Sequence, residues 1–400
     1  MRDDPAFNPT VPFGKVPGVH FARFLILDEV PQDQVKDGGQ TLPAQLIFLA
    51  DVDAPLDDRI NELITVAGRG LDTIYQHCEG YPNAGSASRR EQLAYLRAHM
   101  SGYAALYVNT VGLGLRQIKQ EVELRDAIER FLDTRDWRGS TPTETRTAIQ
   151  EFVRGEPALG WALLPSEAPD LAFVLRDLAD LAAVPIALLL GSPALLAILP
   201  LWAAVLRARE KTDAAPLLRA DDARIQLLAA PEDRIVQNQF SAAGFLKPGW
   251  FRRITASFVL FLVNWGVRHI FNHANLAGVK TIHFARWIFI DGKRRLVFAS
   301  NYDGSLESYM DDFIDKVAWG LNAVFSNGID YPRTSWLVKD GAHDELAFKY
   351  FIRSHQMETQ LWYSAYPELT AINIENNAQI RAGLFKPMNE IETEAWLQRF

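Results

Sequence analysis

The chain has 400 residues, 48% of them hydrophobic and 22% charged, which is the composition of a globular protein of about two domains. The net charge of −8 argues against a general nucleic-acid binder, because such a protein needs a basic excess to neutralise phosphates. The single cysteine, Cys78, cannot form an internal disulfide and fits a reducing compartment.

The first 17 residues are expected to form an N-terminal arm. "MRDDPAFNPTVPFG" is acidic and rich in proline, and it lacks the apolar core of a secretory signal. We therefore place the start of the first folded unit at residue 18.

Two parts of the chain are similar to each other. "GVHFARFLILD" at 18–28 is written again as "TIHFARWIFID" at 281–291, and 50–82 aligns with 300–332 without a gap. Register held over so much chain predicts an internal duplication. The aligned pairs include His20 with His283, Asp53 with Asp303, His99 with His355, and Tyr107 with Tyr363.

Each copy is predicted to contain two strands, a long helix, a short strand, a second helix and a last strand. In the C-terminal copy, Asp291-Gly292 is typical of a hairpin turn, and Ser305 is the expected N-cap of the long helix. The fold class is therefore α+β, with two ferredoxin-like units of antiparallel sheet covered by helices at 18–135 and 280–400. We expect the two units to pack against each other through their sheets.

The region 136–279 is expected to be a helical connection that touches a membrane. From 181 to 206 there are 26 residues without a charge, followed by Arg207 and Arg209. This length exceeds the ~20 residues that cross a bilayer. Prolines within the segment favour a kinked or re-entrant hairpin over a straight span. The alternative is a hairpin buried inside the protein.

A second segment, 250–271, has the composition of an interfacial helix. Its uncharged part runs only from Ile254 to Val267, which is too short to span, and Trp250 and Trp265 suit the headgroup level. The mean hydropathy of −0.07 excludes a polytopic protein. Together, the two segments predict a peripheral or monotopic protein on the cytoplasmic side of a membrane, with membrane lipid as a partner.

No strong catalytic motif is present: the chain has no GxSxG, Walker loop, HExxH or paired CxxC, and no metal site is predicted. A pocket in the C-terminal unit is the expected site. Regular strand alternation places His283 and Arg286 on opposite faces, so at most one of them is expected to belong to it. The alternative role for Asp303 is helix capping, and the alternative for the duplicated histidines is a structural hydrogen bond. The candidate residues are Asp303, His355 and Arg286 for catalysis and His283, Asn301, Tyr363, Tyr366 and Arg381 for substrate binding.

The block "IHFARW…SNYDGS…DFID" resembles an uncharacterised bacterial family associated with dye-decolourising peroxidases. The resemblance covers mainly 280–385, with a weaker echo in 18–130. Those peroxidases are tandem ferredoxin-like proteins that bind haem through a histidine and use an aspartate in a GxxDG motif together with an arginine. The resemblance therefore implies haem as a cofactor, with His355 as its ligand, and a peroxidase as a partner. "SNYDG" keeps Asp303 and Gly304 but lacks the leading glycine.

Two functions follow from these patterns. The first is a membrane-peripheral, non-catalytic protein that binds a lipid, a hydrophobic small molecule or a peroxidase. The second is a haem-dependent peroxidase-like enzyme, or another redox or lipid-modifying enzyme, with its site in the C-terminal repeat. Both functions are compatible with association of the chain into a homo-oligomer.

Overall fold

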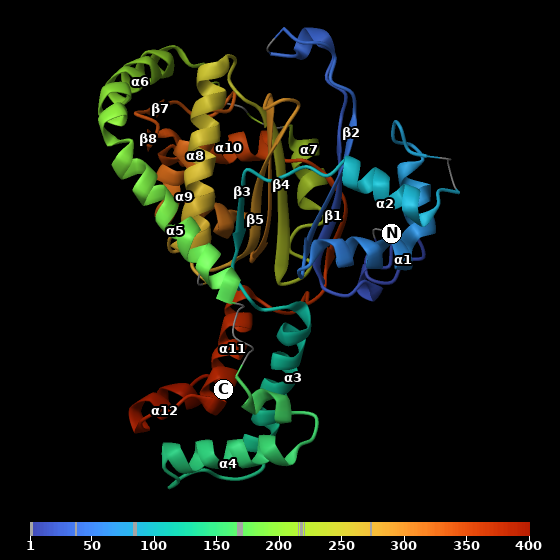
Figure 1. Ribbon diagram of the computed structural model, residues 1–400, viewed down its shortest axis with the longest axis vertical. Coiled ribbons are helices and arrows are strands. Elements are labelled where there is room, and N and C mark those ends of the chain that lie inside the picture. Colours follow the sequence, from blue (N-terminus) through green and yellow to red (C-terminus); the bar gives the residue numbers. More distant parts are fainter. Residues whose placement is uncertain are drawn as a thin grey trace.

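The computed structural model describes residues 3–36, 38–82, 86–165, 171–214, 216, 219, 221–272 and 274–400. The chain has an α+β fold with antiparallel sheets, as the sequence predicts. Figure 1 shows a central body built on the sheets, an outer helical arm on one side of it, and a stalk of helices below it.

The body contains two sheets that pack face to face. One has the strand order β2-β1-β9, and the other has the order β3-β5-β6-β4. Leu25 and Leu49 of the first sheet meet Ile288 and Val297 of the second in an apolar layer between them. The strands are β1 (Val19–Leu27), β2 (Gln45–Val52), β3 (Ala105–Val108), β4 (Gln237–Phe245), β5 (Ile282–Ile290), β6 (Arg295–Asp303) and β9 (Thr359–Ser364), with a small separate pair, β7 (Thr334–Ser335) and β8 (Lys339–Asp340).

The last strand of each similar segment crosses to the other segment's sheet. β3, from the first segment, pairs with β5 through Tyr107 and Ala285. β9, from the second segment, pairs with β1 through Tyr363 and Ala22. The expectation that each copy completes its own four-stranded sheet was therefore wrong. The order of two strands, a long helix, a second helix and a last strand is as predicted in both copies. The predicted short strand between the helices is absent from the described residues of the first copy, and the second copy has the pair β7 and β8 there.

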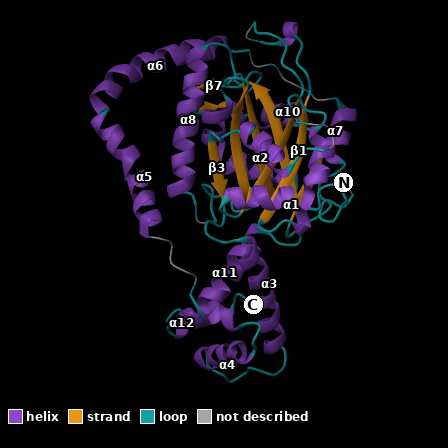
Figure 2. Ribbon diagram, turned by 45° about the vertical axis from the view of Figure 1, so that its right-hand side comes forward, coloured by secondary structure: helices purple, strands orange, loops and turns teal. Residues whose placement is uncertain are grey.

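Helices cover the outer faces of both sheets (Figure 2). α1 (Leu56–Tyr75) and α2 (Arg89–Ala98) lie beyond the first sheet, and α8 (Trp250–His269), α9 (Leu306–Phe325) and α10 (Glu345–His355) lie beyond the second. Ser305 caps α9 by accepting a hydrogen bond from Ser308 N, as predicted. The predicted apolar stripe of α9 is buried along its whole length: Leu306, Met310, Phe313, Ile314, Val317, Leu321 and Val324.

The stalk pairs helices from the two ends of the chain. α3 (Leu115–Leu132) packs beside α11 (Ala371–Phe385), and α4 (Pro142–Gly155) and α12 (Glu390–Leu397) close its far end (Figure 1). Short 3-10 helices lie at Phe13–Lys15, Gln32–Gln34, Gly160–Leu163 and Gly341–His343.

The connecting region was expected to be helical, but it also contains a strand. It contains β4, which pairs with β6 along nine residues and forms the edge of the second sheet. The remaining helices are α5 (Leu171–Leu190), α6 (Ser192–Thr212) and α7 (Asp222–Ala229). α5 and α6 form the outer arm, meeting at Gly191 at an open angle rather than folding back as a hairpin (Figure 2).

Candidate functional site

Two arginines cross between the sheets from equivalent positions. Arg23 on β1 donates to the carbonyl oxygen of Ser300 at 2.8 Å and to the side chain of Asn301, both on β6. Arg286 on β5 donates to the carbonyl oxygen of Ala50 and to the Asp51 carboxylate on β2. Each arginine thus bonds the second strand of the opposite copy, and the sequence alignment pairs Arg23 with Arg286.

This polar layer is a buried cluster with more positive than negative charge. Burial, together with the charge of Arg286, lowers the pKa of Arg23 to about 9. Burial likewise lowers the pKa of Arg286 to about 10. The Asp51 carboxylate pairs with Arg286, and it also accepts from Asn301 Nδ2 at 3.1 Å. The side-chain oxygen of Asn301 in turn accepts from Arg23. These contacts link the two sheets across their shared layer.

A histidine and an aspartate pair at the end of each sheet, next to the stalk. His283 Nε2 lies 2.7 Å from Asp303, whose other carboxylate oxygen accepts from the backbone N–H of Ala371 at the start of α11. His20 Nε2 lies 3.0 Å from Asp53, which accepts from the backbone N–H of Leu115 at the start of α3. Because backbone N–H groups at a helix start lack partners within the helix, both aspartates stabilise a stalk helix.

These contacts decide between the roles considered for Asp303. It does not cap α9, which follows it directly; it accepts from the start of α11, which begins 68 residues later. Opposing effects act on the pKa of its counterpart Asp53. Burial raises this pKa, but the hydrogen bonds from His20 and Leu115 together lower it by more, so the net pKa is lowered.

The expectation that His283 and Arg286 face opposite ways was wrong. The register of β5 against β6 shifts between Ile282 and Phe284, so His283 occupies a β-bulge. A bulge inserts an extra residue and breaks the alternation of side chains. His283 and Arg286 consequently both contact groups between the sheets. β1 has the same shift around His20.

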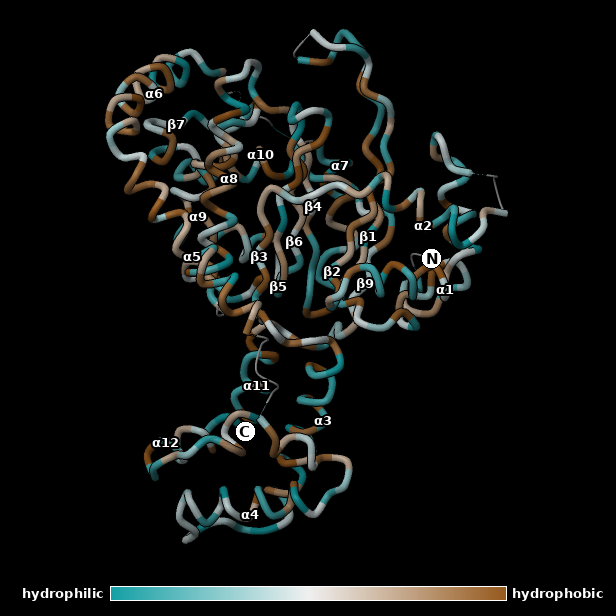
Figure 3. Tube along the Cα trace, in the orientation of Figure 1, coloured by the Kyte–Doolittle hydropathy of each residue, from teal (hydrophilic) through white to brown (hydrophobic). Residues whose placement is uncertain are grey.

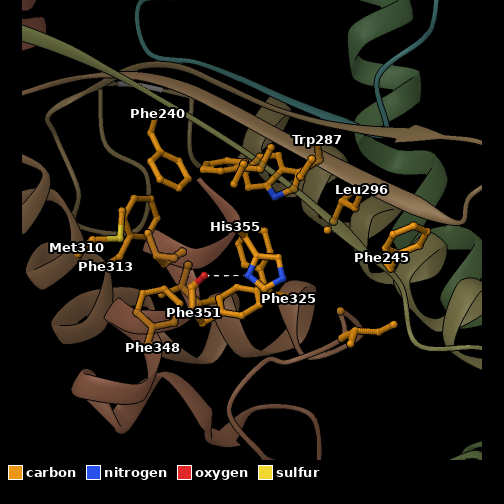
Figure 4. Close-up of a pocket in the computed structure, with 18 of the residues that line it drawn as sticks. Phe240, Phe245, Trp287, Leu296, Met310, Phe313, Phe325, Phe348, Phe351 and His355 are labelled. Carbon is orange, nitrogen blue, oxygen red and sulfur yellow. Dashed lines mark hydrogen bonds between the residues drawn. The ribbon is translucent and has the colours of Figure 1, made fainter. Parts of the chain in front are cut away.

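On the other face of the second sheet, a cavity of about 60 Å³ lies between the strands and helices α9 and α10 (Figure 4). Its wall is almost entirely apolar. The Nδ1–H of His355 donates to the carbonyl oxygen of Phe351 at 2.9 Å, which leaves Nε2 without a partner in the described part of the chain. Burial lowers the pKa of His355, so the ring is neutral at pH 7. The main lining residues are Phe240, Phe245, Trp287, Leu296, Phe298, Met310, Phe313, Phe325, Phe348, Phe351 and His355.

The helix-end hydrogen bond of His355 has a twin. His99 Nδ1 lies 2.8 Å from the carbonyl oxygen of Tyr95, also four residues earlier, at the end of α2. Both imidazoles also lie against the aromatic ring at that position. The structural role considered for the duplicated histidines is therefore present in both copies, and only His355 lines this cavity.

The other candidate residues do not join one pocket. Tyr363 packs in the core beneath α1, 5.6 Å from the ring of Phe13. The Tyr366 hydroxyl bonds His20 Nδ1 at 3.0 Å, and burial raises its pKa. Arg381 lies in the stalk, 3.5 Å from Glu121. Asn301 belongs to the layer between the sheets.

The residues do not fit the haem site that the resemblance implies. In such a site the histidine ligand and the catalytic aspartate and arginine face the same haem. Here His355 lines the cavity on the outer face of the sheet, whereas Asp303 and Arg286 are bonded on its inner face. The cavity is also far below the roughly 300 Å³ at which pockets for drug-sized ligands begin, and haem is at least that large. Within the described residues, no cluster of histidine, cysteine and acidic side chains could hold a metal ion.

The outer arm is rich in hydrophobic residues (Figure 3), and many of its large apolar side chains are exposed. No side chain of α5 is fully buried, so the alternative of a hairpin packed inside the protein is not what the chain forms. One helix in the described part of the chain, Ser192–Thr212, is long and apolar enough to cross a membrane by length and composition, and 6% of its apolar 18-residue window is buried. The exposed apolar side chains include Ile186, Leu189, Leu190, Leu196, Leu199 and Leu201 on the arm and Trp250, Ile254, Phe258 and Phe261 on α8.

Both ends of the arm are fastened to the body. The buried Glu210 of α6 accepts from the backbone N–H groups of Trp336 and Leu337 at 2.8 and 2.7 Å. At the other end, Asp177 of α5 pairs with Arg268 of α8 at 3.2 Å. The exposed apolar surface between these anchors is therefore held in place by specific contacts.

Comparison of the chain with protein-family models, with curated proteins and with solved structures finds no match.

Sequence reasoning missed Arg23, Asp51 and Trp287. Arg23 had a usable signal, because it is aligned with Arg286 in the "HFAR" repeat. Asp51 is aligned with Asn301, so conservation of the acid between the copies could not reveal it. Nothing in the sequence distinguishes Trp287 from an ordinary core residue.

Proposed function

We propose that this chain is a membrane-peripheral binding protein that docks on a lipid surface through the corner between α5 and α6. The observation that carries the proposal is the exposure of Leu190 and Leu196, 77% and 74%, on an arm that ion pairs and buried hydrogen bonds hold in place. A large exposed apolar patch of this kind marks an interaction site.

The anchors limit how deep the arm can enter the lipid. Trp202 bonds Thr255 at 3.2 Å and Leu206 is buried, so α6 lies against the body from residue 202 onward. The unattached part of α6, Ser192–Leu201, is about 15 Å long at the usual rise of an α-helix. The hydrocarbon core of a bilayer is about 30 Å thick. Insertion by the corner at Gly191 therefore reaches only partway, which is monotopic binding.

The charges beside the arm favour an anionic membrane surface. Arg209 and Lys211 are exposed at the end of α6, next to the exposed Trp250 of α8. Basic side chains near the surface strengthen the binding of an apolar face to anionic lipids. The cytoplasmic side fits the half-buried free thiol of Cys78, because a reducing compartment keeps it reduced.

The scaffold itself we infer to be a duplicated pair of ferredoxin-like units that have exchanged their last strands. Three features shared by the two segments support this: the same order of the main strands and helices, the same bulge at His20 and His283, and the same bond between an aspartate and the start of a stalk helix. A peroxidase stays a candidate partner through the resemblance of 280–385. The enzymatic alternative has less support, because His355, Asp303 and Arg286 do not face a common space.

Vesicle flotation tests the proposal. The wild-type chain should float with vesicles containing anionic phosphatidylglycerol, and Leu189→Asp/Leu196→Asp should reduce the floating fraction at least ten-fold. Ile391→Asp is the matched control, since Ile391 is 79% exposed on α12 of the stalk and should leave flotation unchanged. A wild-type chain that stays at the bottom of the gradient contradicts the proposal. So does a folded double variant that floats like the wild type.

A further inference from the structure

The cavity beneath α9 and α10 contains two polar atoms without partners. The indole Nε1–H of Trp287 is buried and has no hydrogen-bond acceptor among the described residues. His355 Nε2 lines the same cavity and also has no partner there. A buried unpaired polar group costs free energy, so the Trp287 N–H calls for an explanation. His355 is half-buried.

The two atoms have opposite hydrogen-bonding characters. An indole nitrogen can only donate. The carbonyl oxygen of Phe351 can only accept, so the proton of the neutral His355 ring lies on Nδ1, and Nε2 is an acceptor. Figure 4 shows Trp287 and His355 on the same cavity, with phenyl rings around them. A group that both accepts and donates satisfies this pair, and a hydroxyl is the smallest such group.

The surroundings determine what the hydroxyl is attached to. Apart from Trp287 and His355, the space is bounded by phenylalanine rings, aliphatic side chains, Met310, Tyr309 and the backbone of Gly244 and Gly328. The Tyr309 hydroxyl already donates to Ser300 Oγ at 2.8 Å. A volume of about 60 Å³ exceeds the ~15 Å³ that one water needs, and it is below the 150 Å³ of an engineered cavity that holds benzene. The space therefore suits an apolar group of a few carbon atoms.

Gly244 on β4 allows this arrangement. A Cβ at this position would lie 2.9 Å from Cδ2 of His355, so a larger residue would displace the imidazole. The aligned histidine of the first copy, His99, is exposed at its helix end instead. The position on a cavity wall is thus particular to the second copy, although the helix-end hydrogen bond is common to both.

We propose that this cavity binds a small alcohol, whose hydroxyl accepts a hydrogen bond from Trp287 Nε1 and donates one to His355 Nε2. The alkyl group lies among the phenyl rings of α9, α10 and the sheet. This site is separate from the lipid-docking arm and does not depend on it.

Titration of the purified full-length chain with 1-propanol, followed by nuclear magnetic resonance of the indole N–H groups, tests the site. The Trp287 signal, assigned by its absence in Trp287→Phe, should shift in a saturable way, while that of the exposed Trp336 should not. Methoxyethane, an isomer that accepts but cannot donate, should bind at least five-fold more weakly, since one hydrogen bond is worth about this factor or more. Leu189→Asp/Leu196→Asp should bind 1-propanol like the wild type, which separates this site from the arm.

His355→Leu keeps the cavity apolar and removes the acceptor. It should reduce the preference for 1-propanol over methoxyethane to less than two-fold. The proposal is overturned if the wild-type Trp287 signal does not respond to 1-propanol, because the cavity then holds only water. It is also overturned if the two isomers bind the wild type equally well.

Discussion

Replacing Asp303 and Asp53 by alanine, one at a time, shows how burial changes the contribution of the same hydrogen bonds to the free energy of unfolding. Asp303 and Asp53 make the same two bonds, to a histidine and to the first N–H of a stalk helix. Their side chains differ in exposure, at 7% and 28%. Asp303→Ala leaves His283 and the Ala371 N–H without partners where water does not enter, while Asp53→Ala leaves its partners within reach of water.

The magnitudes follow from this difference. A buried group left without a partner costs about 1–3 kcal/mol, so two such groups predict a loss of about 3 kcal/mol for Asp303→Ala. Asp53→Ala should cost about 1 kcal/mol, the usual value for a lost cap that water can replace. Urea denaturation followed by circular dichroism measures both. Equal costs for the two variants, or a loss below about 0.5 kcal/mol for Asp303→Ala, would refute the reasoning.

Two further predictions concern buried charge. Asp51→Ala leaves Arg286 buried without its carboxylate partner and should lower the free energy of unfolding by about 3–5 kcal/mol in urea denaturation. A loss below about 1 kcal/mol would show that water reaches the layer. Since the pKa of His355 is lower in the folded chain than its ordinary 6.5, the unfolded chain takes up its proton first as the pH falls through 6.5. The melting temperature of the wild type should therefore fall more between pH 7.5 and 5.5 than that of His355→Leu, and identical slopes would contradict the lowered pKa.

The sequence predicts the helices and strands of this chain better than it predicts which strands pair with each other. The stripe of α9, the Ser305 cap and the turn at Asp291-Gly292 are local patterns, and local patterns survive in the structure. The exchange of β3 and β9 could not be predicted in this way. Both segments contain the same "HFAR" strand, so the last strand of each segment could pair with either one, and its own sequence does not show which.

The candidate site shows the same limit. Alternation along a regular strand separates His283 from Arg286, but a one-residue bulge brings both between the sheets. Bulges depend on how two strands pair, and the sequence of one strand does not reveal them. His355 was found because it recurs in the repeat, yet its cavity depends on Gly244, which lies in a strand that composition alone placed in a helical region.

The depth of the arm in a bilayer tests the central claim most directly. A fluorophore attached at Leu190→Cys in a Cys78→Ser background reports the position of the corner beside Gly191. With anionic vesicles, we expect lipids brominated on their acyl chains to quench the fluorophore, and a quencher trapped inside the vesicles to have no effect. Quenching from the vesicle interior would mean that the arm spans the bilayer. Quenching only by an external water-soluble agent would mean that the arm does not enter the lipid.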